Sequence, residues 1–348
     1  MKSPKIQSSA AAKLLCERYK LNPTDFENLN LRIYQAEPVR KAWKLSTNMG
    51  VLSLKKTPIQ PDRLTFITKG AAYIHQNNFH KMIEYLPFNN GEFFLPKENF
   101  NLILTKWVNG KESDMTDPCQ EYQAAVSMAQ FHQASRGFKL IKDFNRYSRL
   151  GHMEDDFARY QQEILAVPSL VSNRLFPEKL AKLLLEHNNY FLQKAGKAQE
   201  LLKEFNYPSY IRQAQDVSAL LHNDFIYHNL IWQDGEIHLI DLDYMTFDLR
   251  CIDIAKFLRR NLRQSNWKLR VAENIIKGYT SITPLEKEEY KLIYILLYFP
   301  YKYWQTIHFY HTGRRKGYYK RTYNTIKQLV SQKTKKSVFL QRFKEKYL

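Results

Sequence analysis

His222, Asp224, Asn229 and Asp241 have the types and spacing that phosphoryl transfer requires. His222 and Asp224 form an HxD motif, Asn229 follows five residues after Asp224, and Asp241 comes after the turn pair Asp234-Gly235. Phosphoryl transfer needs a carboxylate that orients or accepts the proton of an attacking hydroxyl, and oxygen ligands for the Mg²⁺ that bridges the phosphates. Asp224 would supply that carboxylate, and Asn229 and Asp241 would supply the metal ligands.

The spacing of these residues has a mechanical reason. Short strand patterns flank Asp234-Gly235, and a hairpin places its open ends side by side, so we expect Asn229 and Asp241 to converge. Each residue alone has a plainer interpretation, because Asp and Asn are common turn formers. The joint pattern of HxD, the step to Asn, the DG turn and the exit Asp favours a nucleotide site.

The segments around this motif change from strands to helices along the chain. We expect an α+β fold, with a small antiparallel sheet and one main helix first and a larger, mostly helical body that contains the hairpin. A short helical pattern at 10–19 lies in an N-terminal arm, residues 1–29. The predicted strands are 39–45, 51–56, 81–86 and 101–108, and the predicted helices are 61–76, 178–205 and stretches that start near 117 and 253.

At these motifs the chain resembles the aminoglycoside-phosphotransferase and choline-kinase branch of the protein-kinase-like superfamily. Within that branch it is most similar to the bacterial spore coat protein S family, over roughly residues 30–323. The resemblance implies a bilobal kinase-like fold, with an N-lobe at 30–110 and a helical C-lobe at 111–348. The motifs that carry it are LKK at 54–56, TKWVNGK at 105–111, AQFHQAS at 129–135, IDLDYMTFDLR at 240–250 and YFPYKYWQTIHFYH at 298–311.

The resemblance also implies roles for individual residues, with ATP and Mg²⁺ as cofactors. Asp224 would be the catalytic base, Asn229 and Asp241 the Mg²⁺ ligands, and Lys55 the cation at the α- and β-phosphates. Asp243 either assists the metal or has a structural role. The backbone of Thr105, Lys106, Trp107 and Val108 would hold adenine, and His222 and Asp253 would support the catalytic loop.

The chain departs from the kinase pattern in its first part. No GxGxxG loop precedes Lys55, and the helix predicted at 61–76 contains no glutamate to pair with that lysine. Asp62 at the start of this helix is interpreted as a cap, and Glu84 is a candidate substitute partner. Strand alternation sends Lys55 and Lys56 to opposite faces, so only one of them can face the nucleotide. A catalytically silent version of the fold therefore stays open.

The net charge of +19 is concentrated near the C-terminus. We call residues 301–348 the basic segment; it holds 13 Lys and Arg against the single acid Glu345. Its charges either solvate the outer faces of helices or bind a partner, for which a coat protein is the candidate. No nucleic-acid-binding motif accompanies the charge, so we expect no nucleic acid partner. The aromatic stretch 298–310 either lines an acceptor groove or packs in the core.

Cysteine usage and hydropathy limit the remaining classes. The three scattered cysteines, Cys16, Cys119 and Cys251, indicate neither a disulfide framework nor a zinc site, and no apolar stretch has the length of a bilayer span. We therefore expect cytoplasmic synthesis and no membrane partner, and the resemblance to spore coat proteins implies residence in the spore coat.

Three functional hypotheses follow. The first is a spore-coat-associated phosphotransferase that uses Mg–ATP and a hydroxyl-bearing acceptor that the sequence does not name. The second is a catalytically silent, kinase-like structural protein of the coat. The third is a small-molecule kinase of choline or aminoglycoside type that is unrelated to the coat. Acidic residues that would grip a cationic aminoglycoside are not prominent in the C-terminal half.

Overall fold

The structure is a computed structural model that describes residues 10–22, 25, 29–173, 175–313 and 318–348. Contacts within the chain group into two compact units. The sheet unit comprises residues 1–114, 127–147 and 222–246, and the helical unit comprises residues 115–126, 148–221 and 247–348. Each unit is described by itself.

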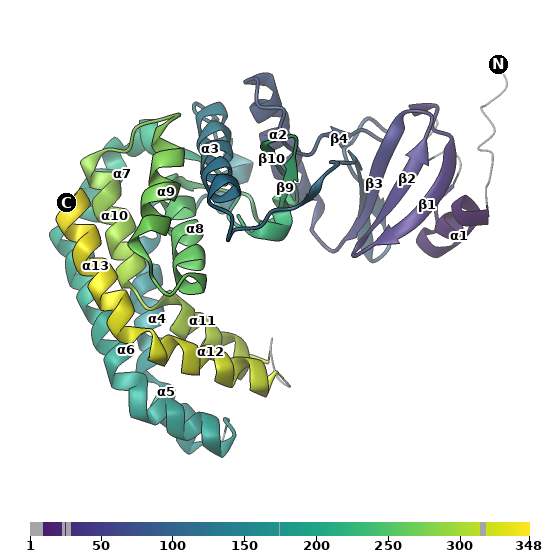
Figure 1. The fold of residues 1–348 in the computed structure, drawn as a ribbon. Coiled ribbons are helices and arrows are strands. Elements are labelled where there is room, and N and C mark those ends of the chain that lie inside the picture. Colours follow the sequence, from purple (N-terminus) through teal and green to yellow (C-terminus); the bar gives the residue numbers. More distant parts are fainter. Residues whose placement is uncertain (1–9, 23–24, 26–28, 174, 314–317) are drawn as a thin grey trace. The chain divides into compact units, whose positions relative to one another are not determined.

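The sheet unit is built around an antiparallel sheet with strand order β1-β2-β3-β6-β4, and β5 also pairs with β6 (Figure 1). Alternating burial along β3 places Leu52 and Leu54 in the core and turns Lys55 to the opposite face. The strands are β1 (Ile33–Val39), β2 (Ala42–Thr47), β3 (Gly50–Thr57), β4 (Tyr85–Leu86), β5 (Leu95–Lys97) and β6 (Phe100–Lys106).

Helix α1 (Ala10–Tyr19) packs on this sheet. Leu15 and Tyr19 are buried in the same apolar cluster as Leu45, and the ring of Tyr19 meets that of Trp43 edge to face at 6.5 Å between centroids. Figure 1 shows α1 beside β1. The short N-terminal helix predicted from the sequence is therefore part of the core of the sheet unit.

The strand predicted at 39–45 forms only from Ala42 onward, as part of β2. Val39 ends β1 and pairs with Ala42 at the start of β2, so Arg40 and Lys41 form a two-residue hairpin turn. Arg40 has a positive φ of 55°, which the sequence does not signal because neither turn residue is Gly, Asn or Asp. The next turn joins β2 to β3: Thr47 pairs with Gly50, and Gly50 has φ 91°.

Helix α2 (Pro61–Gln76) spans the predicted range. Pro61 stands at its first turn, where the missing N–H has no cost, and Leu64, Ile67, Ala71 and Ile74 are buried at helical spacing. The interpretation of Asp62 as a cap is wrong. Its carboxylate accepts a hydrogen bond of 2.5 Å from the Tyr147 hydroxyl and pairs with Arg146, both in the 3₁₀ helix η2 (Lys142–Tyr147).

The predicted hairpin around Asp234-Gly235 is present as β9 (Leu230–Gln233) and β10 (Glu236–Leu239). On its other side, β9 pairs with β7 (Lys111–Glu112). Gly110, with φ +120°, precedes β7 and lies so close to the Trp232 carbonyl that a side chain would overlap it. This hairpin belongs to the sheet unit.

The strand predicted at 81–86 forms only at its end, as β4. Residues before it bind the hairpin instead: the N–H of Ile83 donates to the Leu239 carbonyl, and the N–H of Leu239 donates to the Lys81 carbonyl, each at 2.9 Å. The backbone groups of Lys81 and Ile83, which a longer strand would have paired within the sheet, therefore fix the end of β10 instead. This end lies two residues before Asp241.

Helix α3 (Pro118–Ala134) contributes to both units, and the other long helices belong to the helical unit. The predicted range 178–205 corresponds to α6 (Glu178–Glu204). The unit also contains β8 (Ser218–Leu221) and, apart from its first residue, its partner strand β11 (Thr246–Leu249). Its other helices are α4 (Met153–Leu165), α5 (Val167–Ser172), α7 (Tyr207–Gln213), η3 (Ala214–Val217), α8 (Cys251–Gln264), α9 (Leu269–Thr280), α10 (Lys287–Tyr298), α11 (Tyr301–His311), α12 (Tyr319–Ser331) and α13 (Lys333–Tyr347).

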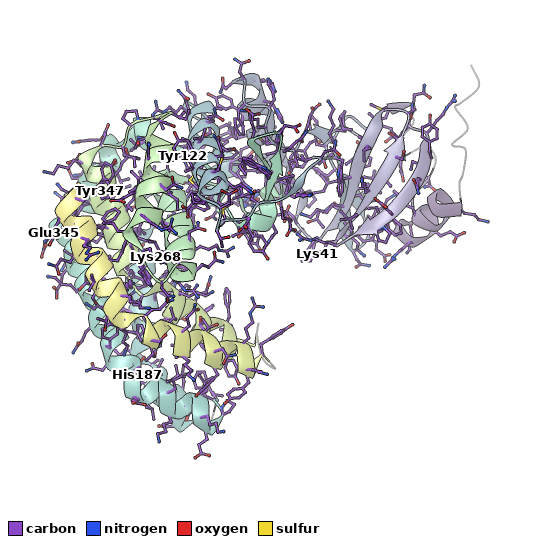
Figure 2. All side chains as sticks on the ribbon, viewed as in Figure 1. Lys41, Tyr122, His187, Lys268, Glu345 and Tyr347 are labelled. Atoms are coloured by element: carbon purple, nitrogen blue, oxygen red, sulfur yellow. The ribbon has the colours of Figure 1, made fainter. Side chains whose placement is uncertain are left out.

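The helices of the basic segment belong to the core of the helical unit. Ile326 of α12 and Phe339, Leu340 and Phe343 of α13 are buried. Glu345 is exposed near the end of α13 (Figure 2). The segment is thus a structural part of the unit that presents charges on its outer face.

A buried ion pair joins α8 to α10. The Arg250 guanidinium donates to both carboxylate oxygens of Glu289, at 2.7 and 2.6 Å, and their side chains are only 4% and 1% exposed. Arg250 also donates to the Thr283 hydroxyl and the Pro284 carbonyl, so each of its three side-chain nitrogens has an acceptor. Such a bidentate pair fixes the two helix starts relative to each other.

The predicted fold class is confirmed: an α+β chain with antiparallel sheets in a small N-terminal region and a mostly helical remainder. Among the described residues, no helix combines the length and apolar character needed to span a bilayer.

Replacement of Glu289 by Gln should destabilise the helical unit by about 3–5 kcal/mol, because it leaves the Arg250 charge buried without its counter-ion. Urea unfolding followed by circular dichroism measures the loss. Glu288→Gln on the same turn is the matched control, since the Glu288 side chain is 45% exposed and its ion pair with Lys291 is 3.8 Å long; it should change the free energy of unfolding by less than about 0.5 kcal/mol. Equal effects of the two variants would contradict the assignment.

Candidate active site

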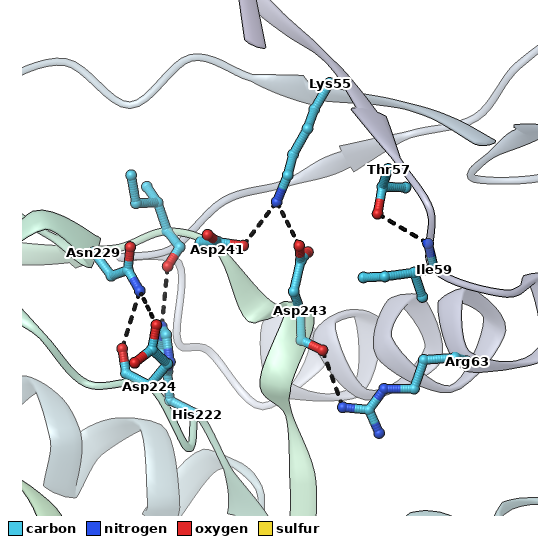
Figure 3. Close-up of polar contacts among 10 residues, drawn as sticks. Lys55, Thr57, Ile59, Arg63, His222, Asp224, Asn229, Asp241 and Asp243 are labelled. Atoms are coloured by element: carbon cyan, nitrogen blue, oxygen red, sulfur yellow. Dashed lines mark hydrogen bonds and ion pairs between the residues drawn. The ribbon is translucent and has the colours of Figure 1, made fainter. Parts of the chain in front are cut away.

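The open ends of the hairpin lie side by side, as its spacing predicts. The N–H of Ile240, which follows β10, donates to the carbonyl of Asn229, which precedes β9, at 3.0 Å. The Nε2 of His222 lies 3.0 Å from the Ile240 carbonyl and connects the HxD loop to the same point. Asp224, Asn229 and Asp241 thereby gather within the sheet unit (Figure 3).

Asp224 and Asn229 are joined directly. The Nδ2 of Asn229 donates to the Asp224 carbonyl at 3.0 Å and to its carboxylate at 3.1 Å. Asn229 is 3% exposed, so packing holds its amide in place. Because Nδ2 makes both contacts with Asp224, the amide oxygen lies on the opposite side of the group and is directed away from that carboxylate.

Lys55 lies between two carboxylates. Its Nζ donates to Asp241 at 2.8 Å and to Asp243 at 2.7 Å, and Figure 3 shows both carboxylates directed at the ammonium. The Lys55 side chain is 24% exposed, so the pairs are only partly screened by water. These three residues come from β3 and from the stretch after β10.

This arrangement shifts the pKa values of all three groups. Burial by itself would raise the pKa of Asp241, but the Lys55 ammonium outweighs it and holds that pKa below its ordinary value. Burial and the neighbouring charge of Asp241 raise the pKa of Asp243, because Lys55 offsets them only in part. Burial opposes the charge of Lys55, yet Asp243 and Asp241 raise the pKa of Lys55.

The structure distinguishes Lys55 from Lys56. Lys56 is exposed on the other face of β3, with its ammonium 3.9 Å from the centroid of the Phe100 ring. The suggestion that Glu84 substitutes for a helix glutamate is wrong, because Glu84 pairs with Lys106 at 2.8 Å. The partners of Lys55 are instead the two acids that follow the hairpin.

Sequence reasoning missed Arg63. This residue of α2 donates from its guanidinium to the carbonyls of Asp243, at 3.1 Å, and Met245, at 2.5 Å. It holds the backbone of the stretch whose side chains meet Lys55, which includes the 3₁₀ turn η5 (Leu242–Tyr244). A basic residue early in a helix that lacks the expected glutamate is the signal that could have identified it.

The backbone of Asp241 is itself unusual, with φ 64° and ψ 71°. This left-handed conformation disfavours most side chains and is tolerated best by Gly, Asn and Asp. It persists because the flanking backbone is held by the hydrogen bonds of Ile240 and Leu239 and by Arg63. The strained backbone turns the Asp241 carboxylate toward Lys55.

The other predicted site residues lie as follows. Thr105 and Lys106 end β6, and Trp107 and Val108 follow that strand. Asp253 is fully buried in the first turn of α8 and belongs to the helical unit. His222 is also fully buried, and its imidazole ring packs against the rings of Phe131 and Phe225.

The donor atoms at the hairpin fit a magnesium ion. Mg²⁺ prefers oxygen ligands, above all carboxylates. The amide oxygen of Asn229 and the carboxylates of Asp241 and Asp243 are of that type, and the lowered pKa of Asp241 keeps its carboxylate ionised. Nitrogen or sulfur ligands that would favour zinc do not occur in this set.

Comparison with known sequences gives the same family as the motifs indicated. The model of the family described as "Spore coat putative kinase YutH" matches residues 25–343. Spore coat protein S of Bacillus subtilis (strain 168) is 24% identical over 314 residues, and the match covers 88% of both chains. The predicted resemblance to spore coat proteins of the kinase-like superfamily is confirmed.

Comparison with solved structures gives the same fold. An aminoglycoside phosphotransferase from Alicyclobacillus acidocaldarius is similar with a TM-score of 0.77 at 19% identity, over 90% of this chain and 92% of that one. A spectinomycin phosphotransferase in complex with ADP and spectinomycin has a TM-score of 0.62 at 14% identity, over 91% and 93%. A microcompartment-associated aminopropanol kinase has a TM-score of 0.60 at 14% identity, over 95% and 98%. At these identities the likeness shows the kinase-like fold alone.

Lys55→Met should lower the free energy of unfolding at pH 7 by about 1–3 kcal/mol, because two carboxylates lose a charged hydrogen-bond donor. The loss should shrink as pH falls toward 4, since an unpaired carboxylate pair takes up a proton more readily in the folded state. Chemical denaturation between pH 4 and 7 measures both. Lys56→Met, on the exposed face, is the control and should stay within about 0.5 kcal/mol at every pH. A pH-independent loss for Lys55→Met would contradict the pairing.

Proposed function

The chain belongs to the spore coat YutH family, and on that premise we propose that it is a phosphotransferase that uses Mg–ATP and a hydroxyl acceptor at the spore coat. The observation that carries the proposal is the gathering of Asp224, Asn229, Asp241 and Lys55 at one end of the hairpin. A carboxylate, metal-type oxygen donors and a cation are the parts that the reaction needs.

Asp224 is the proposed catalytic base. The acceptor oxygen attacks the γ-phosphorus and gives its proton to the Asp224 carboxylate, while the bond from the γ-phosphorus to the bridging oxygen breaks and ADP leaves with that electron pair. The contact from Asn229 Nδ2 supports this role, because it fixes the direction of the carboxylate before the acceptor arrives.

Asn229 and Asp241, assisted by Asp243, are the proposed Mg²⁺ ligands, and the bound ion would neutralise charge on the β- and γ-phosphates. Lys55 is proposed to contact the α- and β-phosphates. Its present contacts with Asp241 and Asp243 support this, since they orient the ammonium in the absence of a helix glutamate.

The stretch Thr105–Val108 is proposed to hold adenine. The N–H of Lys106 donates to the Glu84 carbonyl at 2.9 Å, and the N–H of Trp107 donates to the Val51 carbonyl at 3.0 Å. In the described part of the chain the N–H of Val108 has no such acceptor. Val108 is therefore the proposed backbone donor to the adenine ring.

Two alternatives keep specific support. A catalytically silent coat protein is favoured by the engagement of Lys55 with both carboxylates and by the charged outer faces of α12 and α13, which would bind acidic coat proteins. A small-molecule kinase unrelated to the coat is favoured by the structural neighbours, which include an aminopropanol kinase. Synthesis in the cytoplasm precedes residence in the coat under the main proposal.

The proposal predicts that Mg–ATP stabilises the protein. A ligand at 100 times its dissociation constant adds about 2.7 kcal/mol to the free energy of unfolding, so the melting temperature should rise. Asp241→Ala should abolish the rise. Asp224→Asn should keep it and lower phosphoryl transfer by about 100- to 10,000-fold. Differential scanning fluorimetry measures the first effect, and transfer of label from γ-labelled ATP to a metabolite pool or coat extract measures the second.

Asp143→Ala is the control, because Asp143 is an exposed acid of the same unit, and it should behave as the parent chain in both assays. Stabilisation by Mg–ATP without transfer to any acceptor would select the silent alternative. No stabilisation at millimolar nucleotide would refute the proposed site.

A further inference from the structure

A cavity of about 40 Å³ lies wholly within the helical unit, among α6, α8, α10, α11, α12 and α13. Its walls are aromatic and basic, and no Asp or Glu is among the described residues that line it. The aromatic side chains include Tyr298 and Tyr301, from the stretch whose role the sequence left open. The basic side chains are Lys194, Arg259, Arg263, Lys302, Lys333 and Lys336.

The cations of this cavity are held by neutral groups. Lys194 donates to the Tyr298 hydroxyl at 3.1 Å, and Lys336 donates to the Tyr298 carbonyl at 3.2 Å. Arg259 lies 4.4 Å from the centroid of the Tyr301 ring. Aromatic faces and carbonyls fix the positions of the charges without neutralising them.

Arg263 completes the set. Its terminal nitrogen donates to the side-chain oxygen of Gln328 at 3.1 Å, whereas its Nε is buried and has no hydrogen-bond acceptor in the described part of the chain. A buried N–H of a charged group without an acceptor is costly, and native proteins retain few of them. The atom marks a place where an acceptor is expected.

Electrostatics point the same way. Burial lowers the pKa of Lys336 to about 7, and the nearby charges of Arg259, Lys194 and Arg263 add to the effect. Burial also lowers the pKa of Arg259 to about 10. Several helices thus present mutually repelling cations to one small space, an arrangement that an anion would relieve.

We propose that this cavity binds a phosphate group of a small anionic ligand. Guanidinium and ammonium donors that approach from different helices match the several acceptor oxygens of a tetrahedral oxyanion. The volume admits a group of a few heavy atoms, not a whole nucleotide. The site uses none of the residues around Asp224, so it goes beyond the proposed phosphoryl transfer.

The test uses the full chain without nucleotide and titrates inorganic phosphate against potassium chloride at equal ionic strength. Phosphate should raise the melting temperature in a saturable way. Lys336→Met should weaken the apparent phosphate affinity at least tenfold, whereas Lys335→Met, an exposed neighbour on α13, should not change it. Phenyl phosphate serves as the second probe: tighter binding than inorganic phosphate identifies an ester with an aromatic body, and equal binding identifies the free anion.

A pH series provides an independent readout. The pKa of Lys336 is about 7 in the folded chain and higher in the unfolded chain, so the unfolded state binds more protons between those values. Without phosphate, the melting temperature of Lys336→Met should therefore be higher than that of the parent chain near pH 7. The difference between the two melting temperatures should narrow as pH rises toward 10. Saturating phosphate should reverse the order of the two melting temperatures near pH 7.

Stabilisation by phosphate that equals that by chloride, or that is the same in Lys336→Met and Lys335→Met, would overturn the proposal. Stabilisation of Lys336→Met by Mg–ATP separates this outcome from failure of the proposed nucleotide site, because the two sites share no residue.

Discussion

The contact of the Lys55 ammonium with two carboxylates is the interaction on which the geometry of the hairpin end depends. Asp241 and Asp243 are two positions apart and both carry negative charge when ionised, so they repel unless a cation lies between them. Lys55 supplies that cation from β3, and Arg63 fixes the backbone of the same stretch from α2. Backbone hydrogen bonds from Leu239 to Lys81, from Ile83 to Leu239 and from Ile240 to Asn229 complete the support. A left-handed Asp241 is sustainable only within such a frame.

This frame explains which parts of the molecule the sequence could predict. The hairpin followed from the turn chemistry of Asp234-Gly235, and α2 followed from Pro61 and its apolar spacing, because both are local properties. The partner of Lys55 lies 186 residues away in the chain, and no local rule selects among the acids. The turn at Arg40 was not predicted for a different reason, since its residues are not typical turn formers. Residues 81–84 resemble a strand but bind the hairpin instead.

The net charge of the chain is divided between two physical roles. Exposed Lys and Arg on α12 and α13 surround the buried Ile326 and Phe343 and solvate the outer face. Lys333 and Lys336 of the same helix α13 turn inward to the aromatic cavity. Composition alone predicted one basic surface, whereas the fold separates a solvated face from a set of inward cations whose pKa values are lowered by burial. The net charge of +19 therefore includes two kinds of site, an exposed basic face and a set of partly buried cations.

The sheet unit is assembled from three separate stretches of the chain, the last of which ends at residue 246. During synthesis the sheet emerges from the ribosome long before the hairpin. Lys55 of β3 therefore has neither Asp241 nor Asp243 as a partner until about two thirds of the protein has been made. Among the described residues, the apolar core of the sheet comes from 15–104 alone, whereas the pairing of Lys55 with its two acids is a late, long-range event. A gene fragment that encodes only the sheet would yield a chain without the acids that its own lysine requires.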